Sequence, residues 1–106
     1  MSVVIREKDS GAVLAEADAP GPAVLPYEGN LYFAPDAVKA DVLKLTERTY
    51  TCPYKGTCNW VDYVGPDGRM VKDVAWVYPE VKAGHELIRG RYGFYAGSRG
   101  GTVEAS

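Results

Sequence analysis

Near the middle of the chain, two strand-like segments are joined by a four-residue turn. Thr57–Val64 and Arg69–Tyr78 are rich in β-branched and aromatic residues, and they flank Gly65-Pro66-Asp67-Gly68. Proline and aspartate suit the two centre positions of a type I turn, and Gly68 suits the left-handed position of the bulge that follows such a turn in a hairpin. The sequence therefore predicts a central antiparallel hairpin.

The turn also predicts how the two strands pair. It sets Asp62 opposite Lys72, which is a favourable cross-strand charge pair. One face of the hairpin then holds Cys58, Trp60, Val74 and Trp76, with Trp60 opposite Val74 and Cys58 opposite Trp76. The other face holds Val61, Tyr63, Val71, Ala75 and Val77, with Asn59 and Asp73 as its polar members. Both faces are largely apolar, which predicts a hairpin covered on two sides.

Short strand-like segments surround this hairpin. Val3–Arg6 and Ala12–Ala15 flank turn residues and predict a first hairpin. The run from 17 to 26 is rich in Ala, Pro and Gly and predicts a loop. The apolar spacing from 35 to 45 predicts a short helix, and the alternative is a helical turn followed by a strand over 41–45.

The remaining segments complete a mainly β protein. Strands are expected over 31–33, 86–95 and 102–105, with a flexible loop over 97–101. A chain of 106 residues fits one domain. We expect a single β domain over 1–106 with about six to eight short strands and one short helix.

Composition restricts the partners and the compartment. The chain has 12 Lys and Arg against 14 Asp and Glu, so its net charge is −2, and nucleic-acid binding is not expected because it needs clustered cations. No run of about 18 apolar residues is present, and the N-terminus lacks the pattern of a signal peptide. We expect a cytoplasmic protein without membrane contact, as a monomer or homodimer.

The cysteines and the single histidine predict no metal site. Cys52 and Cys58 are too few for a disulfide scaffold or for a four-ligand zinc site. A mixed site of both thiols, His85 and a carboxylate is conceivable, but two reduced thiols in a reducing cytoplasm are favoured. His85 is expected to be solvated. We predict neither a metal nor a cofactor.

The segment before the central hairpin carries the candidate site. Pro53 and Gly56 in Cys52-Pro53-Tyr54-Lys55-Gly56 favour a rigid loop that holds Lys55 beside aromatic surface. Lys55 could bind an anion, with help from Arg89 or Arg91. Tyr63 and Tyr95 join the aromatic residues that either line a pocket or belong to the core. The predicted ligand-binding residues are Cys52, Tyr54, Lys55, Trp60, Asp73, Trp76, Tyr78 and Tyr92.

Three motifs carry a resemblance to a known family. They are Thr51-Cys52-Pro53-Tyr54-Lys55-Gly56-Thr57, Asp73-Val74-Ala75-Trp76-Val77-Tyr78-Pro79 and Tyr92-Gly93-Phe94-Tyr95. With them the chain resembles the largely bacterial domain of unknown function 427 over about residues 2 to 105. Cys58 departs from the family pattern, which has a small residue there, and Pro79 comes earlier than usual.

The resemblance implies a fold but little chemistry. The family looks like a β-tent, in which two roughly orthogonal antiparallel sheets pack together, similar to methionine sulfoxide reductase B. It is sometimes labelled nucleotidyltransferase-like. Such enzymes need closely spaced metal-binding carboxylates after a Gly-Ser turn, and no acidic pair follows Gly97-Ser98 within reach. The label therefore finds no support in these residues.

Three functions remain open. The first is binding of a small anionic molecule in an aromatic pocket beside Lys55. The second is a thiol-dependent oxidoreductase in which Cys52 is the nucleophile, its pKa lowered by Lys55, and Cys58 the resolving thiol. The third is a module that binds a protein partner. Asp73 is a further catalytic candidate, as a general base, and whether any reaction is catalysed stays open. A pocket lined by Lys55, Trp60 and Trp76 favours the first function, and well-separated buried thiols would exclude the second.

Overall fold

The computed structural model describes residues 2–105, and two antiparallel sheets dominate it. One sheet has the order β2-β1-β10-β9, with β1 over Ser2–Glu7, β2 over Val13–Asp18, β9 over Ser98–Arg99 and β10 over Thr102–Ala105. The other has the order β3-β4-β8-β7-β6-β5, with β3 over Val24–Tyr27, β4 over Asn30–Phe33, β5 over Leu43–Cys52, β6 over Gly56–Val64, β7 over Met70–Val77 and β8 over Tyr92–Tyr95. Two short 3-10 helices are η1 over Pro35–Ala37 and η2 over Glu86–Ile88.

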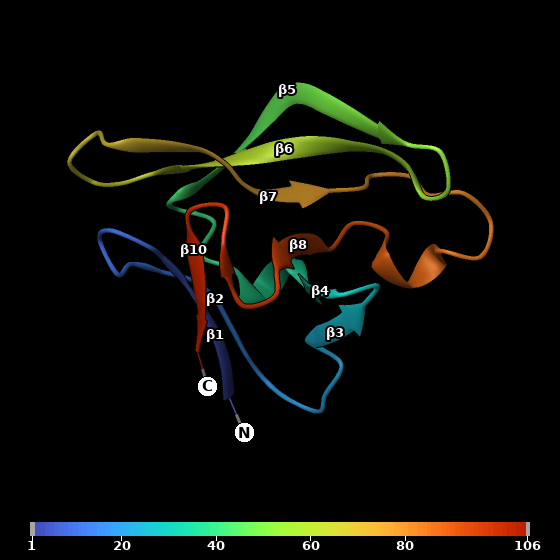
Figure 1. Ribbon diagram of the computed structural model, residues 1–106, viewed down its shortest axis with the longest axis horizontal. Helices are drawn as coiled ribbons and strands as arrows, with labels where there is room; N and C mark the ends of the chain where they lie inside the picture. Colours follow the sequence, from blue (N-terminus) through green and yellow to red (C-terminus); the bar gives the residue numbers. More distant parts are fainter. Residues whose placement is uncertain (1, 106) are drawn as a thin grey trace.

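The strands of the four-stranded sheet run across those of the long hairpins in the six-stranded sheet (Figure 1). The prediction of a mainly β protein built from two antiparallel sheets is confirmed. In the described part of the chain, no helix has the length and hydrophobicity needed to cross a membrane.

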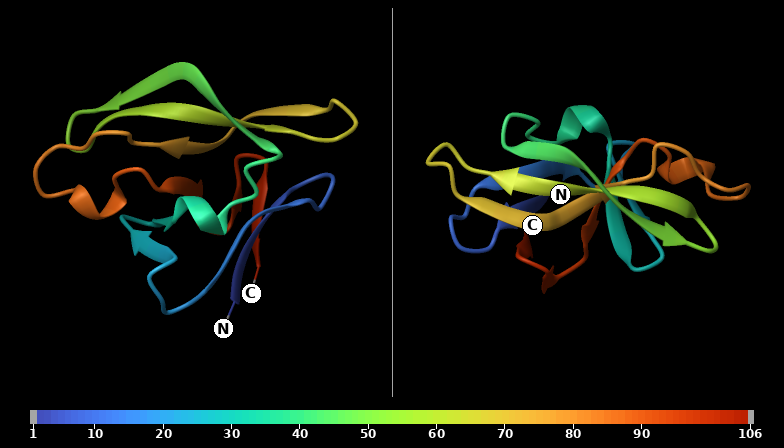
Figure 2. Two further views of the ribbon diagram at one scale, coloured as in Figure 1. Left: turned by 180° about the vertical axis from the view of Figure 1, so that it is seen from behind. Right: turned by 90° about the horizontal axis from the view of Figure 1, so that it is seen from above.

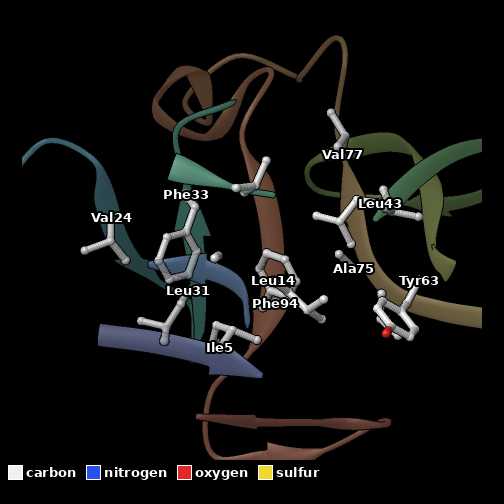
Figure 3. Close-up of a cluster of buried hydrophobic side chains, with 14 of the residues drawn as sticks. Ile5, Leu14, Val24, Leu31, Phe33, Leu43, Tyr63, Ala75, Val77 and Phe94 are labelled. Carbon is white, nitrogen blue, oxygen red and sulfur yellow. The ribbon is translucent and has the colours of Figure 1, made fainter. Parts of the chain in front are cut away.

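The main hydrophobic core lies between the two sheets. Ile5 and Leu14 come from the four-stranded sheet, and Phe33 and Phe94 come from the six-stranded sheet; all four are fully buried (Figure 3). The two phenylalanine rings meet edge to face, with centroids 5.7 Å apart. Each such side chain contributes about 1.5 to 3 kcal/mol through its burial, so this core is what holds the sheets together.

A second apolar cluster covers the opposite face of the six-stranded sheet. Its buried members are Tyr32, Cys52, Cys58, Trp76, Tyr78 and Ile88. Successive side chains on a strand point to opposite faces, so Trp76 belongs to this cluster while its neighbours Ala75 and Val77 belong to the core. We call this side of the sheet the outer face. The central hairpin is therefore covered on both sides, as the sequence predicts.

The turn of the central hairpin forms as predicted. The Gly68 N–H donates to the Gly65 carbonyl at 3.0 Å, and Gly68 has a φ of 84°. Val64 pairs with Met70, in agreement with the predicted register. Beyond Tyr63 and Val71 the agreement ends, because the next pair is Val61 with Ala75.

A bulge in β7 makes the rest of the predicted register wrong. Lys72, Asp73 and Val74 together occupy the stretch opposite Asp62. Asp62 is buried and does not pair with Lys72: its carboxylate accepts the Asp73 N–H at 3.0 Å and is ion-paired with Arg48 of β5. The bulge turns Val74 into the core and places Trp60 opposite Trp76.

The helix predicted over 35–45 is wrong. Only Pro35–Ala37 is helical, as a single 3-10 turn, and the strand β5 begins at Leu43. Val38 instead forms an isolated bridge with Ala15 of β2. Tertiary pairing has overridden a weak helical spacing, and the alternative of a helical turn followed by a strand is closer to the structure.

Three other segments also differ from expectation. The strand predicted over 86–95 is confined to Tyr92–Tyr95, because η2 turns the chain so that Ile88 fills the outer-face cluster. The loop predicted over 17–26 contains the beginning of β3, and the loop predicted over 97–101 contains β9. The hairpin of β1 with β2 and the strand β10 follow the prediction.

Glu7 is a buried carboxylate at the end of β1. It accepts the N–H groups of Asp9 and Ser10, both at 2.9 Å, and pairs at 3.0 Å with Arg69, which directly precedes β7 in the turn of the central hairpin. Burial by itself raises the pKa of Glu7, but these hydrogen bonds and the guanidinium of Arg69 outweigh it and lower the pKa from 4.5 to about 2. This ion pair links the tips of two hairpins.

We predict that Glu7→Gln lowers the free energy of unfolding at pH 7 by about 1 to 3 kcal/mol, because Arg69 loses its buried partner. A carboxylate with a lowered pKa stabilises the fold above its unfolded pKa, and this stability is lost as the pH falls from 4.5 towards 2. Urea denaturation of both proteins between pH 7 and pH 3 should show the difference between them shrinking as the pH falls. A constant difference would contradict the role given to the ionised carboxylate.

Candidate functional site

A cavity of about 200 Å³ opens on the outer face of the six-stranded sheet. It receives side chains from β4, β5, β6, β7 and β8 and from the loop between β5 and β6, so segments far apart in sequence meet there. Its lining residues are Asn30, Tyr32, Tyr50, Cys52, Lys55, Cys58, Trp60, Trp76, Tyr78 and Tyr95.

Trp76 is the centre of an aromatic wall. Its ring lies 4.9 Å from that of Tyr95 and 6.1 Å from that of Tyr32, centroid to centroid, and 6.2 Å from that of Trp60. The Trp76 Nε1–H donates to the Tyr32 hydroxyl at 3.1 Å. Edge-to-face contacts of this kind favour one arrangement of the rings, and the wall is formed by contacts within the protein itself.

Gly93 of β8 makes room for this wall. It pairs with both Tyr32 and Trp76 in the adjacent strands, and a Cβ at this position would lie 2.4 Å from Trp76 Nε1 and 2.8 Å from Tyr32 Cε2. No side chain tolerates such distances. The absence of a side chain at Gly93 therefore allows the indole of Trp76 to lie across β8.

Lys55 supplies a positive charge to the cavity. Its Nζ donates at 2.7 Å to Glu28, and its side chain is 17% exposed while that of Glu28 is 49% exposed. This hydrogen bond raises the pKa of Lys55 and lowers that of Glu28. Glu28 and Gly29 both have positive φ, of 50° and 83°, which is the two-residue turn that joins β3 to β4 and holds the carboxylate beside Lys55.

The loop that carries Lys55 is held from a neighbouring segment. The Lys82 N–H donates to the Lys55 carbonyl at 2.9 Å, and the Lys82 Nζ donates to the Pro53 carbonyl at 2.9 Å. Figure 2 shows the connection after β7 lying beside the loop between β5 and β6. Lys55 is thus positioned by contacts on its own backbone.

Two free thiols also line the cavity, and their environments differ. Burial raises the pKa of Cys52, but hydrogen bonds from the N–H groups of Lys55 and Tyr54 and the charge of Lys55 outweigh it, so the pKa is lowered overall. Burial raises the pKa of Cys58, although it is hydrogen-bonded with Tyr78. Cys52 is therefore the more acidic of the two thiols.

Five of the eight predicted ligand-binding residues lie together at the cavity. They are Cys52, Lys55, Trp60, Trp76 and Tyr78. Tyr54 is 75% exposed and points away, and Tyr92 packs against the core between the sheets. Asp73 lies at the bulge of β7, where it pairs with Arg48 at 3.1 Å. These three residues do not line the cavity.

Other residues considered from the sequence have structural partners. Arg91 donates to the Pro22 carbonyl at 2.8 Å and Arg89 pairs with Glu80, so neither lies with Lys55. His85 is not a purely solvated side chain, because its Nδ1 is hydrogen-bonded to the Tyr27 hydroxyl at 2.5 Å. Within residues 2–105, no three His, Cys, Asp or Glu side chains are grouped as metal ligands would be.

Sequence reasoning missed Asn30, Tyr32 and Tyr50 of the lining and also Glu28. Tyr50 could have been found, because it lies two residues before Cys52 on one strand and therefore shares its face. Tyr32 and Asn30 could not have been found in this way, because their strand is brought near the other lining residues only by the strand order β4-β8-β7-β6.

Residues 3–105, almost the whole chain, match the family described as Domain of unknown function (DUF427). The chain belongs to this family. The short name of the DUF427 family refers to nucleotidyl transfer, but its description assigns no function. No curated protein matches the chain significantly.

We predict that Gly93→Ala lowers the free energy of unfolding of this DUF427 protein by about 1 to 3 kcal/mol, through overpacking against Trp76. The loss should be smaller in a Trp76→Leu background, because the clash with the indole is then removed and only the contact with Tyr32 remains, and the two substitutions should couple by about 0.5 to 3 kcal/mol. Urea denaturation followed by circular dichroism measures all four proteins. Equal losses in both backgrounds would show that the close approach to Trp76 is not the cause.

Proposed function

We propose that the protein binds a small anionic molecule that carries one flat ring, with the ring against Trp60 and Trp76 and the anion at Lys55. The observation that carries this proposal is the cavity itself, which combines six aromatic side chains with one lysine. Ligand sites are typically apolar hollows with few polar groups that orient the ligand. Asn30 and the Tyr50 hydroxyl add neutral hydrogen-bonding groups to the lining.

The size of the cavity supports a single-ring ligand. Its volume of about 200 Å³ is below the roughly 300 to 1,000 Å³ of sites that enclose drug-sized molecules. A dinucleotide would extend far outside it. A six-membered ring with one carboxylate is of the right order, and its flat faces can stack on an indole or meet it edge to face.

A bound anion must share Lys55 with Glu28. A lysine ammonium has three N–H donors, and Glu28 accepts one of them through its Oε1. A ligand carboxylate can therefore accept another donor without displacing Glu28. Because the two carboxylates carry the same charge, Glu28 weakens anion binding, and its removal should strengthen it.

We predict that nicotinate binds and that nicotinamide, its neutral counterpart of the same shape, binds more weakly. Lys55→Ala should weaken nicotinate binding about 10- to 100-fold, as expected for the loss of a charged hydrogen bond, and should leave nicotinamide nearly unchanged. Glu28→Gln should tighten nicotinate binding and not affect nicotinamide. Isothermal titration calorimetry measures each dissociation constant, and quenching of tryptophan fluorescence gives an independent value.

Tyr54→Ala is the matched control, because Tyr54 belongs to the same loop as Lys55 and is exposed away from the cavity. This substitution should not change the dissociation constant of either ligand. Benzoate and phenyl phosphate, tested beside nicotinate, extend the result to other single-ring anions. The proposal is wrong if none of these anions binds at millimolar concentration, or if binding is unaffected by Lys55→Ala.

A further inference from the structure

The two thiols of the protein face the same cavity from one hairpin. In the pairing of β5 with β6, Cys52 lies opposite Gly56 and Tyr50 lies opposite Cys58. Because alternate residues share a face, Cys52 and Cys58 are diagonal neighbours on the outer face. Both belong to the cavity lining, and both are free. They are therefore close to one another, contrary to the well-separated arrangement that would exclude joint chemistry.

Cys52 has the surroundings of an attacking thiol. Although burial raises the pKa of Cys52, the backbone N–H groups of Tyr54 and Lys55 and the positive charge of Lys55 lower it overall. These three contacts stabilise a thiolate, which is the nucleophilic form of cysteine. Cys52 also lines the cavity, so a small molecule bound there lies beside it.

Cys58 has different surroundings. It is 1% exposed, lies deeper, and shares a hydrogen bond with Tyr78, whose own pKa is raised by burial. A thiol of this kind stays protonated and does not react first with an external reagent. It can react second, once Cys52 has brought an activated sulfur next to it.

We propose that Cys52 and Cys58 form a thiol–disulfide exchange site that reduces small organic disulfides bearing a flat ring. Cys52 is the attacking thiol and Cys58 the resolving thiol. The aromatic wall of Trp60 and Trp76 receives the ring next to the sulfur that is attacked. This proposal uses the same cavity as the proposed anion binding but does not depend on it.

Each step of this reaction is balanced. The Cys52 thiolate attacks one sulfur of the substrate disulfide, a new S–S bond forms at Cys52, and the other half of the substrate leaves as a thiolate. Cys58 then gives up its proton and attacks the Cys52 sulfur as a thiolate, and the second half of the substrate leaves as a thiolate that takes up this proton. One disulfide has been reduced to two thiols by two electrons from the protein, which ends as a Cys52–Cys58 disulfide.

Closing the protein disulfide requires a small movement. Diagonal neighbours across antiparallel strands have Cα atoms about 7 to 8 Å apart, and disulfides need about 4.4 to 6.8 Å. Cys52 is the last residue of β5, next to the turn Pro53-Tyr54-Lys55. A shift of about an ångström at the end of this hairpin brings the two Cα atoms into this range.

The test uses 2,2′-dithiodipyridine, a disulfide with two flat rings whose released pyridine thione absorbs light. The Cys58→Ser protein should release one thione at nearly the wild-type initial rate and retain one pyridylthio group, on Cys52. The Cys52→Ser protein should react on the order of tenfold more slowly or worse, because its remaining thiol is protonated and buried. Wild type should release two thiones and retain no pyridylthio group. Intact-mass spectrometry measures what is retained.

A second measurement uses the wild-type protein alone, so its result does not depend on whether the variants fold. Wild type treated with less than one equivalent of reagent, trapped with acid and mapped by peptide mass spectrometry, shows which cysteine reacts first. Wild type unfolded in urea is the control, in which both thiols should react at equal rates. First reaction at Cys58, or two pyridylthio groups retained on folded wild type, would overturn the proposal.

The two proposals fail separately. If nicotinate and the other ring anions do not bind but thione release follows the pattern above, the anion-binding function is wrong and the exchange site stands. If nicotinate binds in a Lys55-dependent way but Cys52 and Cys58 react alike, the exchange site is wrong and the anion-binding function stands.

Discussion

The buried carboxylate of Asp62 determines how the central hairpin pairs, and the cavity depends on that pairing. A buried carboxylate needs hydrogen-bond or charged partners, and Asp62 has them in the guanidinium of Arg48 and the N–H of Asp73. The second contact requires β7 to bulge towards it, and Asp73 takes a φ of 60° there. Without the bulge, Trp76 would lie opposite Cys58; with it, Trp60 and Trp76 are direct neighbours and form a wall.

The six-stranded sheet contributes side chains both to the core and to the cavity. On β4 the buried neighbours Tyr32 and Phe33 point to opposite sides, and on β8 Phe94 faces the core while Gly93 and Tyr95 face outwards. The core residues fix the strands that carry the cavity residues, so the wall needs no ligand to be ordered. The same alternation means that a change of register at any of these strands would exchange the two sets of side chains.

Local signals in the sequence predict what depends on neighbours in the chain. The hairpin turn at Gly65–Gly68, its two apolar faces and the grouping of Cys52, Lys55, Trp60, Trp76 and Tyr78 all follow from short-range pattern and agree with the structure. The register beyond Tyr63 could not be predicted, because Arg48, which comes from the strand β5, decides it. The helix expected over 35–45 fails for the same kind of reason: Val38 is paired with Ala15, which is far away in the sequence.

Lys55 connects the two proposed roles of the cavity. Its charge holds Glu28, lowers the pKa of Cys52 and is the proposed partner of a bound anion. An anion bound at Lys55 would add a negative charge beside the Cys52 sulfur and raise the pKa of that thiol. By thermodynamic linkage, a thiolate at Cys52 would weaken the binding of the anion to the same extent. If the cavity has both roles, they therefore oppose each other, because both depend on the ammonium group of Lys55. Glu28, which is half exposed at the edge of the cavity, is bonded to the same ammonium group and weakens its effect both on a bound anion and on Cys52.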